Sequence, residues 1–303
     1  MTASPGTTEH AERFTLLRPL LFTIAYEILG SATESDDVLQ DSYLRWSQVE
    51  LSTVHDPKSY LAQLVTRQAL NALRADARRR EDNVGPWLPE PLLLQEQDPS
   101  ADVGLAESVS MAMLVLLETL SPEERAVFVL REVFGFDYDE IASAVDKSVP
   151  TVRQIAHRAR EHMQARRRRF GPVDPEQNAR ITAEFLAAAS SGDVQTVMSM
   201  LAPDVVWTAD GGGKATAARR PVVGAQKVAS AVIGIMRVGK RMADVRLELA
   251  VCNSAPAVLF YRGDNLEGVF TAEIIDGKIT NFYAVRNPDK LAALATARAI
   301  SRA

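Results

Sequence analysis

Residues 137–169 constrain the fold of this 303-residue chain more than any other segment. Asp137 and Glu140 have the spacing of a capping box, so a helix is expected to start at this point. Asp146 stands where the chain must turn sharply, and Ser148 then caps a second helix. Two short helices joined by a tight turn are the pattern of a helix-turn-helix, a motif that reads duplex DNA.

The second of these helices is expected to have one buried face and one basic face. Val152, Ile155 and Ala159 recur at helical spacing on the apolar face. The other face carries side chains that can bind guanine or adenine edges and backbone phosphates. These side chains are Thr151, Arg153, Gln154, His157, Arg158 and Arg160. A solvated face of a helical bundle is the alternative, but the density of arginine and the two caps favour DNA binding.

The charge of the chain is unevenly distributed. The formal net charge is −5, yet cationic residues concentrate at 74–80 and 153–169. Such local basic surfaces can meet phosphate while the acidic remainder limits indiscriminate DNA binding. Cys252 is the single cysteine and cannot form an internal disulfide. The polar amino terminus and the lack of a long apolar run predict a cytoplasmic protein with no membrane partner.

The first part of the chain has the periodicity of three helices. Phe14, Leu21 and Ile28 belong to one apolar stripe, and Ser35 is expected to cap a second helix. Asp56 is expected to cap a third helix that ends in arginines. Several prolines after residue 81 then favour an extended linker. Helices resume after it and continue to the arginine run at residue 169.

A Gly-Pro-Val-Asp-Pro sequence at residues 171–175 ends the helical pattern, and a different kind of sequence follows. Two helical segments come first. Residues 245–251 then alternate as in a half-buried strand. Asp276 and Gly277 form a strong hairpin signal, because both residue types tolerate positive φ. This third module is therefore expected to be an α+β cone.

The first two modules resemble the extracytoplasmic-function (ECF) sigma factors of RNA polymerase. Residues 35–46, SDDVLQDSYLRW, are similar to the family segment that docks on the clamp helices of the polymerase beta-prime subunit. Residues 66–80, TRQALNALRADARRR, resemble the segment that meets the opened −10 promoter element. The second helix of the helix-turn-helix corresponds to the family's reader of the −35 element.

Three short motifs extend the resemblance to the third module. They are WLPEP at residues 87–91, DGGGK at 210–214 and NPDKL at 287–291. In this order behind two sigma-like domains, they identify the sigma-factor-J type, which carries a SnoaL-like (NTF2-like) domain. The implied fold is multidomain: two all-α sigma domains, the second with the helix-turn-helix, followed by an α+β NTF2-like cone.

The resemblance also implies domain boundaries. Residues 10–80 correspond to sigma domain 2 and residues 108–169 to sigma domain 4, with a linker at 81–107 between them. Residues 177–291 correspond to the SnoaL-like regulatory domain, and 292–303 to a C-terminal tail.

Two further sets of binding residues are implied by the family. Core polymerase binding is implied for Asp36, Asp37, Gln40 and Asp41. Binding of the −10 region is implied for Arg67, Asn71, Arg74, Arg78 and Arg79. Asn71 departs from the family pattern, in which an aspartate is expected. From the residues alone, an acidic solvent-facing helix start and a solvated helix end are the alternatives.

The three motifs are expected to form an interdomain regulatory contact. The residues are Trp87, Leu88, Pro89, Glu90, Pro91, Asp210, Gly211, Gly212, Gly213, Lys214, Asn287, Pro288 and Asp289. We expect the Trp-Leu-Pro segment to dock on the third domain, so that this domain controls the separation of the two DNA-reading domains. The alternatives are that the prolines only keep the linker extended, and that the glycines only allow a tight turn.

The expected function is that of a sigma factor that binds core RNA polymerase and directs initiation at promoters with −10 and −35 elements. The third domain is expected to modulate this activity in cis, without catalysis or a cofactor. The runner-up is a DNA-binding regulator fused to a SnoaL-like enzyme or ligand-sensing domain, with Asp210 as the first candidate base. All four histidines precede the cone, so a histidine-aspartate pair is not available within it. A noncatalytic pocket for a small-molecule ligand remains an open alternative.

Overall fold

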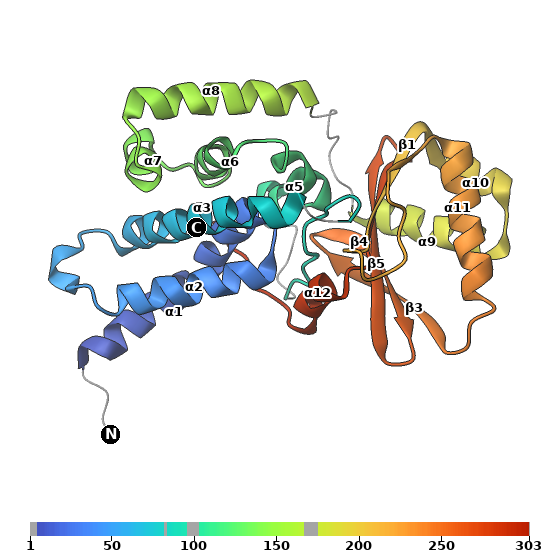
Figure 1. The fold of residues 1–303 in the computed structure, drawn as a ribbon, viewed down its shortest axis with the longest axis horizontal. Coiled ribbons are helices and arrows are strands. Elements are labelled where there is room, and N and C mark those ends of the chain that lie inside the picture. Colours follow the sequence, from blue (N-terminus) through green and yellow to red (C-terminus); the bar gives the residue numbers. More distant parts are fainter. Residues whose placement is uncertain (1–4, 82–83, 96–102, 167–174, 303) are drawn as a thin grey trace.

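The computed structural model describes residues 5–81, 84–95, 103–166 and 175–302. The molecule has a helical half and a half built on a β-sheet, and the linker runs between the two (Figure 1). The carboxyl-terminal residues return from the sheet to the helical half, where the Ser301 amide donates to Thr23 Oγ1 at 3.0 Å. Within the described ranges, no helix combines the length and hydropathy needed to cross a membrane.

The first helical unit is a bundle of three helices around an apolar core. Its elements are α1 (Pro5–Leu29), α2 (Ala32–Trp46), the short 3-10 helix η1 (Leu51–Thr53) and α3 (Pro57–Glu81). Leu21, Ile24 and Ile28 of the expected stripe are fully buried. Trp46 is fully buried as well, and its indole nitrogen donates to the backbone oxygen of His10 at 3.0 Å. The bundle predicted from periodicity is confirmed.

The start of α2 differs from the prediction. Ser31, not Ser35, is the N-cap, and its side chain accepts from the Glu34 amide at 3.1 Å. Ser35 is buried one turn into the helix, and its hydroxyl donates to the backbone oxygen of Ser31 at 2.6 Å. The prediction was wrong because both serines have the right spacing, and only the left-handed Gly30 (φ 70°) shows where α1 ends.

The second helical unit contains shorter helices and the helix-turn-helix. Its elements are α4 (Val103–Ser108), α5 (Met111–Leu117), α6 (Pro122–Phe128), the π-helical segment η3 (Val129–Val133), α7 (Tyr138–Val145) and α8 (Val149–Arg166). Ser121 and Glu124 form the capping box that starts α6. All but the last residue of helix α4 lie in the range 81–107 that was expected to be linker, so part of that range is helical.

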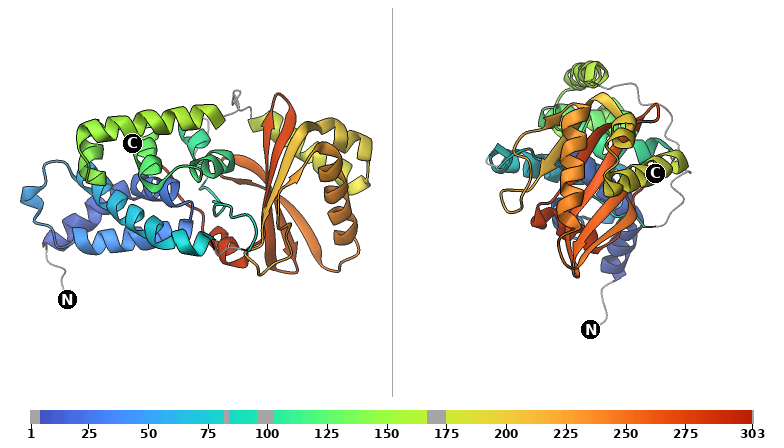
Figure 2. Two further views of the ribbon diagram at one scale, coloured as in Figure 1. Left: turned by 45° about the horizontal axis from the view of Figure 1, so that its top comes forward. Right: turned by 90° about the vertical axis from the view of Figure 1, so that its right-hand side faces the viewer.

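The third unit is a six-stranded sheet whose three longer helices cover the face that points away from the helical half (Figures 1 and 2). Its helices are α9 (Pro175–Ser191), α10 (Val194–Met200), α11 (Ala225–Gly239), α12 (Pro288–Leu291) and the 3-10 helix η4 (Ala292–Ala295). Its strands are β1 (Leu201–Asp210), β2 (Val222–Val223), β3 (Val245–Cys252), β4 (Ala255–Arg262), β5 (Asn265–Ile275) and β6 (Lys278–Val285). The strand order is β2-β1-β6-β5-β4-β3, and the pair β1 and β6 is parallel. The α+β cone is confirmed, and Asp276 (φ 50°) and Gly277 (φ 74°) make the predicted hairpin.

The two faces of this sheet have different partners. One face packs on α9, α10 and α11 through a core that includes Phe185, Trp207 and Ile233. The other face packs on the linker and on the second helical unit, because Leu88 and Met111 share a buried cluster with strand residues such as Val269. The sheet thus uses its second face to hold other parts of the same chain.

Candidate nucleic-acid and polymerase interfaces

The helix-turn-helix has the caps and the turn that its sequence predicts. The Asp137 amide donates to Glu140 Oε2 at 2.9 Å at the start of α7. Asp146 ends this helix in the left-handed conformation, with φ 53° and ψ 54°. The following amide, that of Lys147, donates back to the Ala142 oxygen at 3.1 Å. Aspartate is among the residues that tolerate this conformation, so the tight turn forms without glycine.

Helix α8 lies at the edge of the molecule with its predicted faces as expected (Figures 1 and 2). Its buried residues are Val152, Ile155, Ala156, Ala159 and Met163. Its exposed residues include Thr151, Arg153, Gln154, His157 and Arg158. Arg160 differs from these five because it is half-buried, and its Nη2 lies 2.6 Å from Glu132 Oε1. The helix therefore presents a polar surface of the kind that enters a major groove.

The basic face of α3 contacts the helix-turn-helix unit. Arg67 Nη2 donates to the backbone oxygen of Ser143 in α7. Arg74 Nη2 lies 2.6 Å from Glu123 Oε1 in α6, and this hydrogen bond is the main cause of the lowered pKa of Glu123. These contacts bring residues predicted to bind the −10 region against the unit predicted to read the −35 element.

An open cleft of about 470 Å³ lies between α3 and the turn after α7. It is lined by Arg67, Leu70, Asn71, Arg74, Ala144, Val145 and Asp146. Asn71 therefore lies beside the two arginines with which it was grouped. The side chains of Arg78 and Arg79 lie outside the part of the chain that the structure describes.

The acidic residues of α2 are mostly accessible. Asp37, Gln40 and Asp41 are exposed. Asp36 is half-buried and accepts from Arg18 in α1 and from Arg298 in the C-terminal tail. The four residues implied to bind core polymerase thus share one helix, and one of them is already engaged within the chain.

The linker motif is attached to the cone through Asp210. Leu88 donates its amide to Asp210 Oδ2 at 2.9 Å, and Lys290 Nζ lies 2.6 Å from the same oxygen. Lys290 also donates to the backbone oxygen of Leu88 and lies 4.0 Å from the centre of the Trp87 ring. Gly212 donates its amide to the other carboxylate oxygen at 2.9 Å. The three sequence motifs therefore meet at one buried ion pair.

Other residues of the motifs support this meeting point. Asn287 caps α12, and its side chain lies beside Gly212, where an added Cβ would be 2.3 Å from Asn287 Nδ2. Gly213 lies close to the linker, since an added Cβ would be 3.2 Å from the Val84 side chain. Lys214 and Asp289 form an exposed ion pair at 2.5 Å. The glycines thus allow close approach as well as tight turning.

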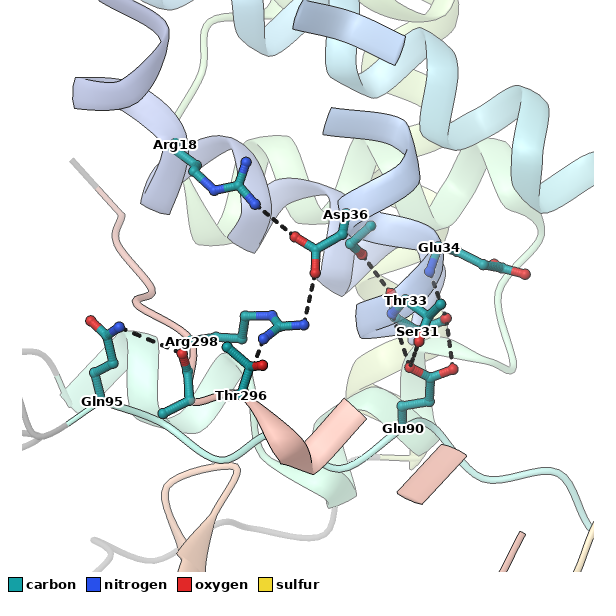
Figure 3. Close-up of polar contacts among 11 residues, drawn as sticks. Arg18, Ser31, Thr33, Glu34, Asp36, Glu90, Gln95, Thr296 and Arg298 are labelled. Carbon is teal, nitrogen blue, oxygen red and sulfur yellow. Dashed lines mark hydrogen bonds and ion pairs between the residues drawn. The ribbon is translucent and has the colours of Figure 1, made fainter. Parts of the chain in front are cut away.

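The same linker motif is attached to the first helical unit through Glu90. Its carboxylate accepts from Ser31 Oγ at 2.9 Å and from the Thr33 amide at 3.0 Å, at the start of α2 (Figure 3). Its backbone amide donates to Gly30 at 2.8 Å, and its carbonyl accepts from the Tyr26 hydroxyl at 2.6 Å. Glu90 is 7% exposed, so these contacts form inside the molecule.

Asn253 is a functional candidate that sequence reasoning missed. It lies in the β3–β4 turn with φ 52° and is fully buried. Its side chain accepts from the Leu92 amide and donates to the Tyr26 hydroxyl and the Val109 oxygen, each at 2.8 Å. It therefore contacts the linker and both helical units. The Asn-Ser pair signals a turn, but nothing local indicates these distant partners.

Asp210 is the first candidate for a catalytic base in the cone, but its carboxylate is engaged by other groups of the same chain. It has no exposed surface, and Lys290 and two backbone amides contact its carboxylate. Its position is therefore that of a structural anchor for the linker.

Two family models match the helical units. Sigma-70 region 2 matches residues 14–79, and sigma-70 region 4 matches residues 110–163. The ECF RNA polymerase sigma factor SigJ of Mycobacterium tuberculosis is 35% identical over 288 residues, which are 91% of this chain and 91% of the relative. The probable ECF RNA polymerase sigma factor SigI of the same species is 32% identical over 278 residues, which are 90% of this chain and 92% of the relative.

Similarity at the level of structure extends over the whole chain. The crystal structure of Mycobacterium tuberculosis SigJ matches with a TM-score of 0.75 and 30% identity, over 94% of this chain and 99% of that chain. The match includes the cone as well as both helical units. The helix-turn-helix, the acidic helix and the three motifs thus occur together with full-length similarity, and the chain belongs to the ECF RNA polymerase sigma factor family.

Proposed function

We propose that this protein binds core RNA polymerase and directs initiation by recognising −10 and −35 promoter elements, and that its cone modulates this activity in cis. Polymerase binding and promoter-specific initiation are implied by membership of the ECF sigma factor family. The functional units in this proposal are residues 10–80, 108–169 and 177–291, with a linker at 81–107 and a tail at 292–303.

Each expected residue set has one role in this proposal. The exposed face of α8 reads the −35 element, while the arginines and Asn71 of α3 contact the −10 region. Asp36, Asp37, Gln40 and Asp41 bind a basic element of core polymerase. The support is that most of the −35 set is exposed on α8 and that the acidic set lies on α2. Arg67, Asn71 and Arg74 of the −10 set line one cleft.

The double attachment of the linker is the observation that supports cis modulation most directly. Asp210 and Lys290 of the cone hold Leu88, while Glu90, two residues later, is bound to the start of α2. Asn253 adds a contact between the cone and both helical units. A change in the position of the cone must therefore be transmitted to the linker that joins the two promoter readers.

The packing of α3 on the helix-turn-helix unit supports the same proposal. Elements centred near −10 and −35 are about 25 base pairs apart, which is roughly 85 Å of duplex at about 3.4 Å per base pair. Arg67 and Arg74 contact the second helical unit directly. Recognition of both elements at once therefore requires the two units to separate, and the cone is attached where it can oppose this separation.

Run-off transcription with purified core polymerase tests the proposal. The full chain should direct initiation at one promoter. The double variant Asp210→Ala, Lys290→Ala should raise the rate of initiation there, because its linker is released from the cone. Arg237→Ala, an exposed change on α11, is the matched control for loss of a cationic side chain. Unchanged rate and promoter choice in a folded double variant would refute modulation in cis.

A gel-shift assay separates a sigma factor from a DNA-binding regulator that acts alone. Tight binding to promoter DNA should need core polymerase in the first case. Tight and specific binding by the protein alone would favour the second.

A further inference from the structure

The C-terminal tail continues from the cone onto the polymerase-binding side of the first helical unit. After η4, the Arg298 amide donates to the Leu93 oxygen at 2.9 Å, and the Arg298 oxygen accepts from the Gln95 amide at 3.0 Å. The Ser301 amide then reaches Thr23 Oγ1 in α1 at 3.0 Å, and Ile300 packs against the core of the helical half. The tail is thus attached to the linker and to α1 in succession.

The side chain of Arg298 reaches from this tail to α2 (Figure 3). Its Nη2 lies 2.8 Å from Asp36 Oδ2, while Arg18 Nη2 lies 2.8 Å from Asp36 Oδ1. The Arg298 guanidinium also lies 5.9 Å from the centre of the Phe22 ring. The side chains of Arg298 and Asp36 are 18% and 30% exposed, so the pair is partly shielded from solvent. Both carboxylate oxygens of Asp36 are therefore engaged by cations of the same chain.

We propose that residues 296–302 are a built-in competitor of core polymerase, in which Arg298 occupies the site on Asp36 that a basic polymerase element would take. This inference rests on the proposed function, because it needs Asp36 to be a docking residue. Asp37, Gln40 and Asp41 on the same helix remain exposed. A basic partner can therefore make first contact with these residues before it displaces Arg298.

The contact between Arg298 and Asp36 is weak enough for polymerase to displace the tail. A partly exposed ion pair contributes modestly to stability, so removal of Arg298 should strengthen polymerase binding by about two- to five-fold. The tail also pairs with linker residues 93–95, which follow the segment held by the cone. Displacement of the tail by polymerase would therefore remove one of the contacts that keep the linker in place.

Binding of the full chain to purified core polymerase tests the inference. Arg298→Ala and Arg298→Glu should both lower the Kd, and the glutamate should lower it at least as far because it repels Asp36. Arg237→Ala and Arg237→Glu on α11 are charge-matched controls that should leave the Kd unchanged. In the Arg298→Ala background, Asp36→Asn should raise the Kd again, because the uncovered docking carboxylate is then lost.

Hydrogen exchange of the unaltered protein gives a second readout that needs no variant. The Arg298 and Ser301 amides are hydrogen-bonded in the free protein and should exchange slowly, and they should exchange faster in the polymerase complex. Continued protection in the complex would overturn the inference. So would an unchanged or higher Kd for the Arg298 variants when the wild-type chain binds core. If neither wild type nor variant binds core, the proposed function itself fails and this inference fails with it.

Discussion

Asp210 and Lys290 form a buried ion pair, with Oδ2 of the carboxylate 2.6 Å from Nζ of the ammonium group. Their side chains are 0% and 9% exposed, and the Leu88 amide completes the site at 2.9 Å from the same oxygen. An anion and a cation that are 80 residues apart in the chain thus hold a third segment between them.

Removal of one partner of this pair should be strongly destabilising. Asp210→Asn or Lys290→Met leaves a buried charge without its counter-charge. In comparable sites such a change lowers the free energy of unfolding by about 3–5 kcal/mol. Urea unfolding measures this loss of stability. Faster hydrogen exchange of the Leu88 amide would show that the linker has been released from the cone. Asp289→Asn breaks the exposed pair with Lys214 and should cost less than about 1 kcal/mol. If disruption of the buried pair and of the exposed pair lowered stability equally, the role of Asp210 as a structural anchor for the linker would be contradicted.

Glu90 should be needed to hold the linker on the first helical unit. Glu90→Ala removes the buried acceptor for Ser31 and Thr33, so we expect the free energy of unfolding to fall by roughly 2–4 kcal/mol. Limited proteolysis should then cut the linker sooner than in the wild-type protein. Glu184→Ala removes a carboxylate on the exposed face of α9 and is the control, expected to be near neutral. Unchanged linker cleavage in Glu90→Ala would contradict this expectation.

Gly212 and Gly277 both have positive φ, but only Gly212 is crowded. A Cβ on Gly212 would lie 2.3 Å from Nδ2 of the Asn287 side chain, whereas a Cβ on Gly277 would meet nothing within 4 Å. Gly277→Ala should therefore cost only the backbone strain of about 1 kcal/mol, and Gly212→Ala clearly more. Thermal unfolding of the two variants side by side measures the difference. A smaller loss for Gly212→Ala would show that the DGGGK loop can move away from Asn287.

Glu27 should make stability depend on pH. It is fully buried, and this burial raises its pKa from 4.5 to about 8, despite a hydrogen bond from Ser108 and the nearby Arg125 and Arg302. Between these two values the folded state holds a proton that the unfolded state has lost. Stability should therefore fall as pH rises from about 4.5 to 8, by at most about 1.4 kcal/mol per pH unit.

Glu27→Gln tests this dependence, because it keeps the shape and the acceptor for Ser108 without a titrating group. The variant should lose this component of the pH slope and be more stable than wild type near pH 8. Chemical denaturation at several pH values provides the comparison. Parallel curves for the two proteins between pH 5 and 8 would show that Glu27 is not protonated in the folded state.

Glu123 should restrain a predicted DNA contact. Glu123→Gln releases Arg74, and promoter affinity of the complex with core polymerase should rise by about two- to five-fold. The gain should shrink at high salt, because both the pair and the phosphate contact are screened. Glu184→Gln, on the exposed face of α9, changes the charge by the same amount without touching Arg74 or any residue assigned to DNA. If promoter affinity rises equally in both variants, the cause is the change in net charge and not the release of Arg74.

The parts of the structure that the sequence predicts well are those controlled by neighbours along the chain. Asp146 in its turn, the apolar face of α8 and the hairpin at Asp276 and Gly277 are examples. Caps, turn residues and helical or strand periodicity act over a few residues, and a short segment therefore contains the information. Ser35 shows the limit of such reasoning, because an equivalent serine four residues earlier is the cap.

The sequence by itself thus determined the order of the units, their helical or sheet character and the residue types available for DNA and polymerase. Only the tertiary structure decided which of these residues meet. The contact of Asp210 with Lys290, the reach of Asn253 into both helical units and the pairing of Arg298 with Asp36 join segments between 80 and 262 residues apart. Such contacts depend on how whole units pack through their buried surfaces, and no local propensity specifies them.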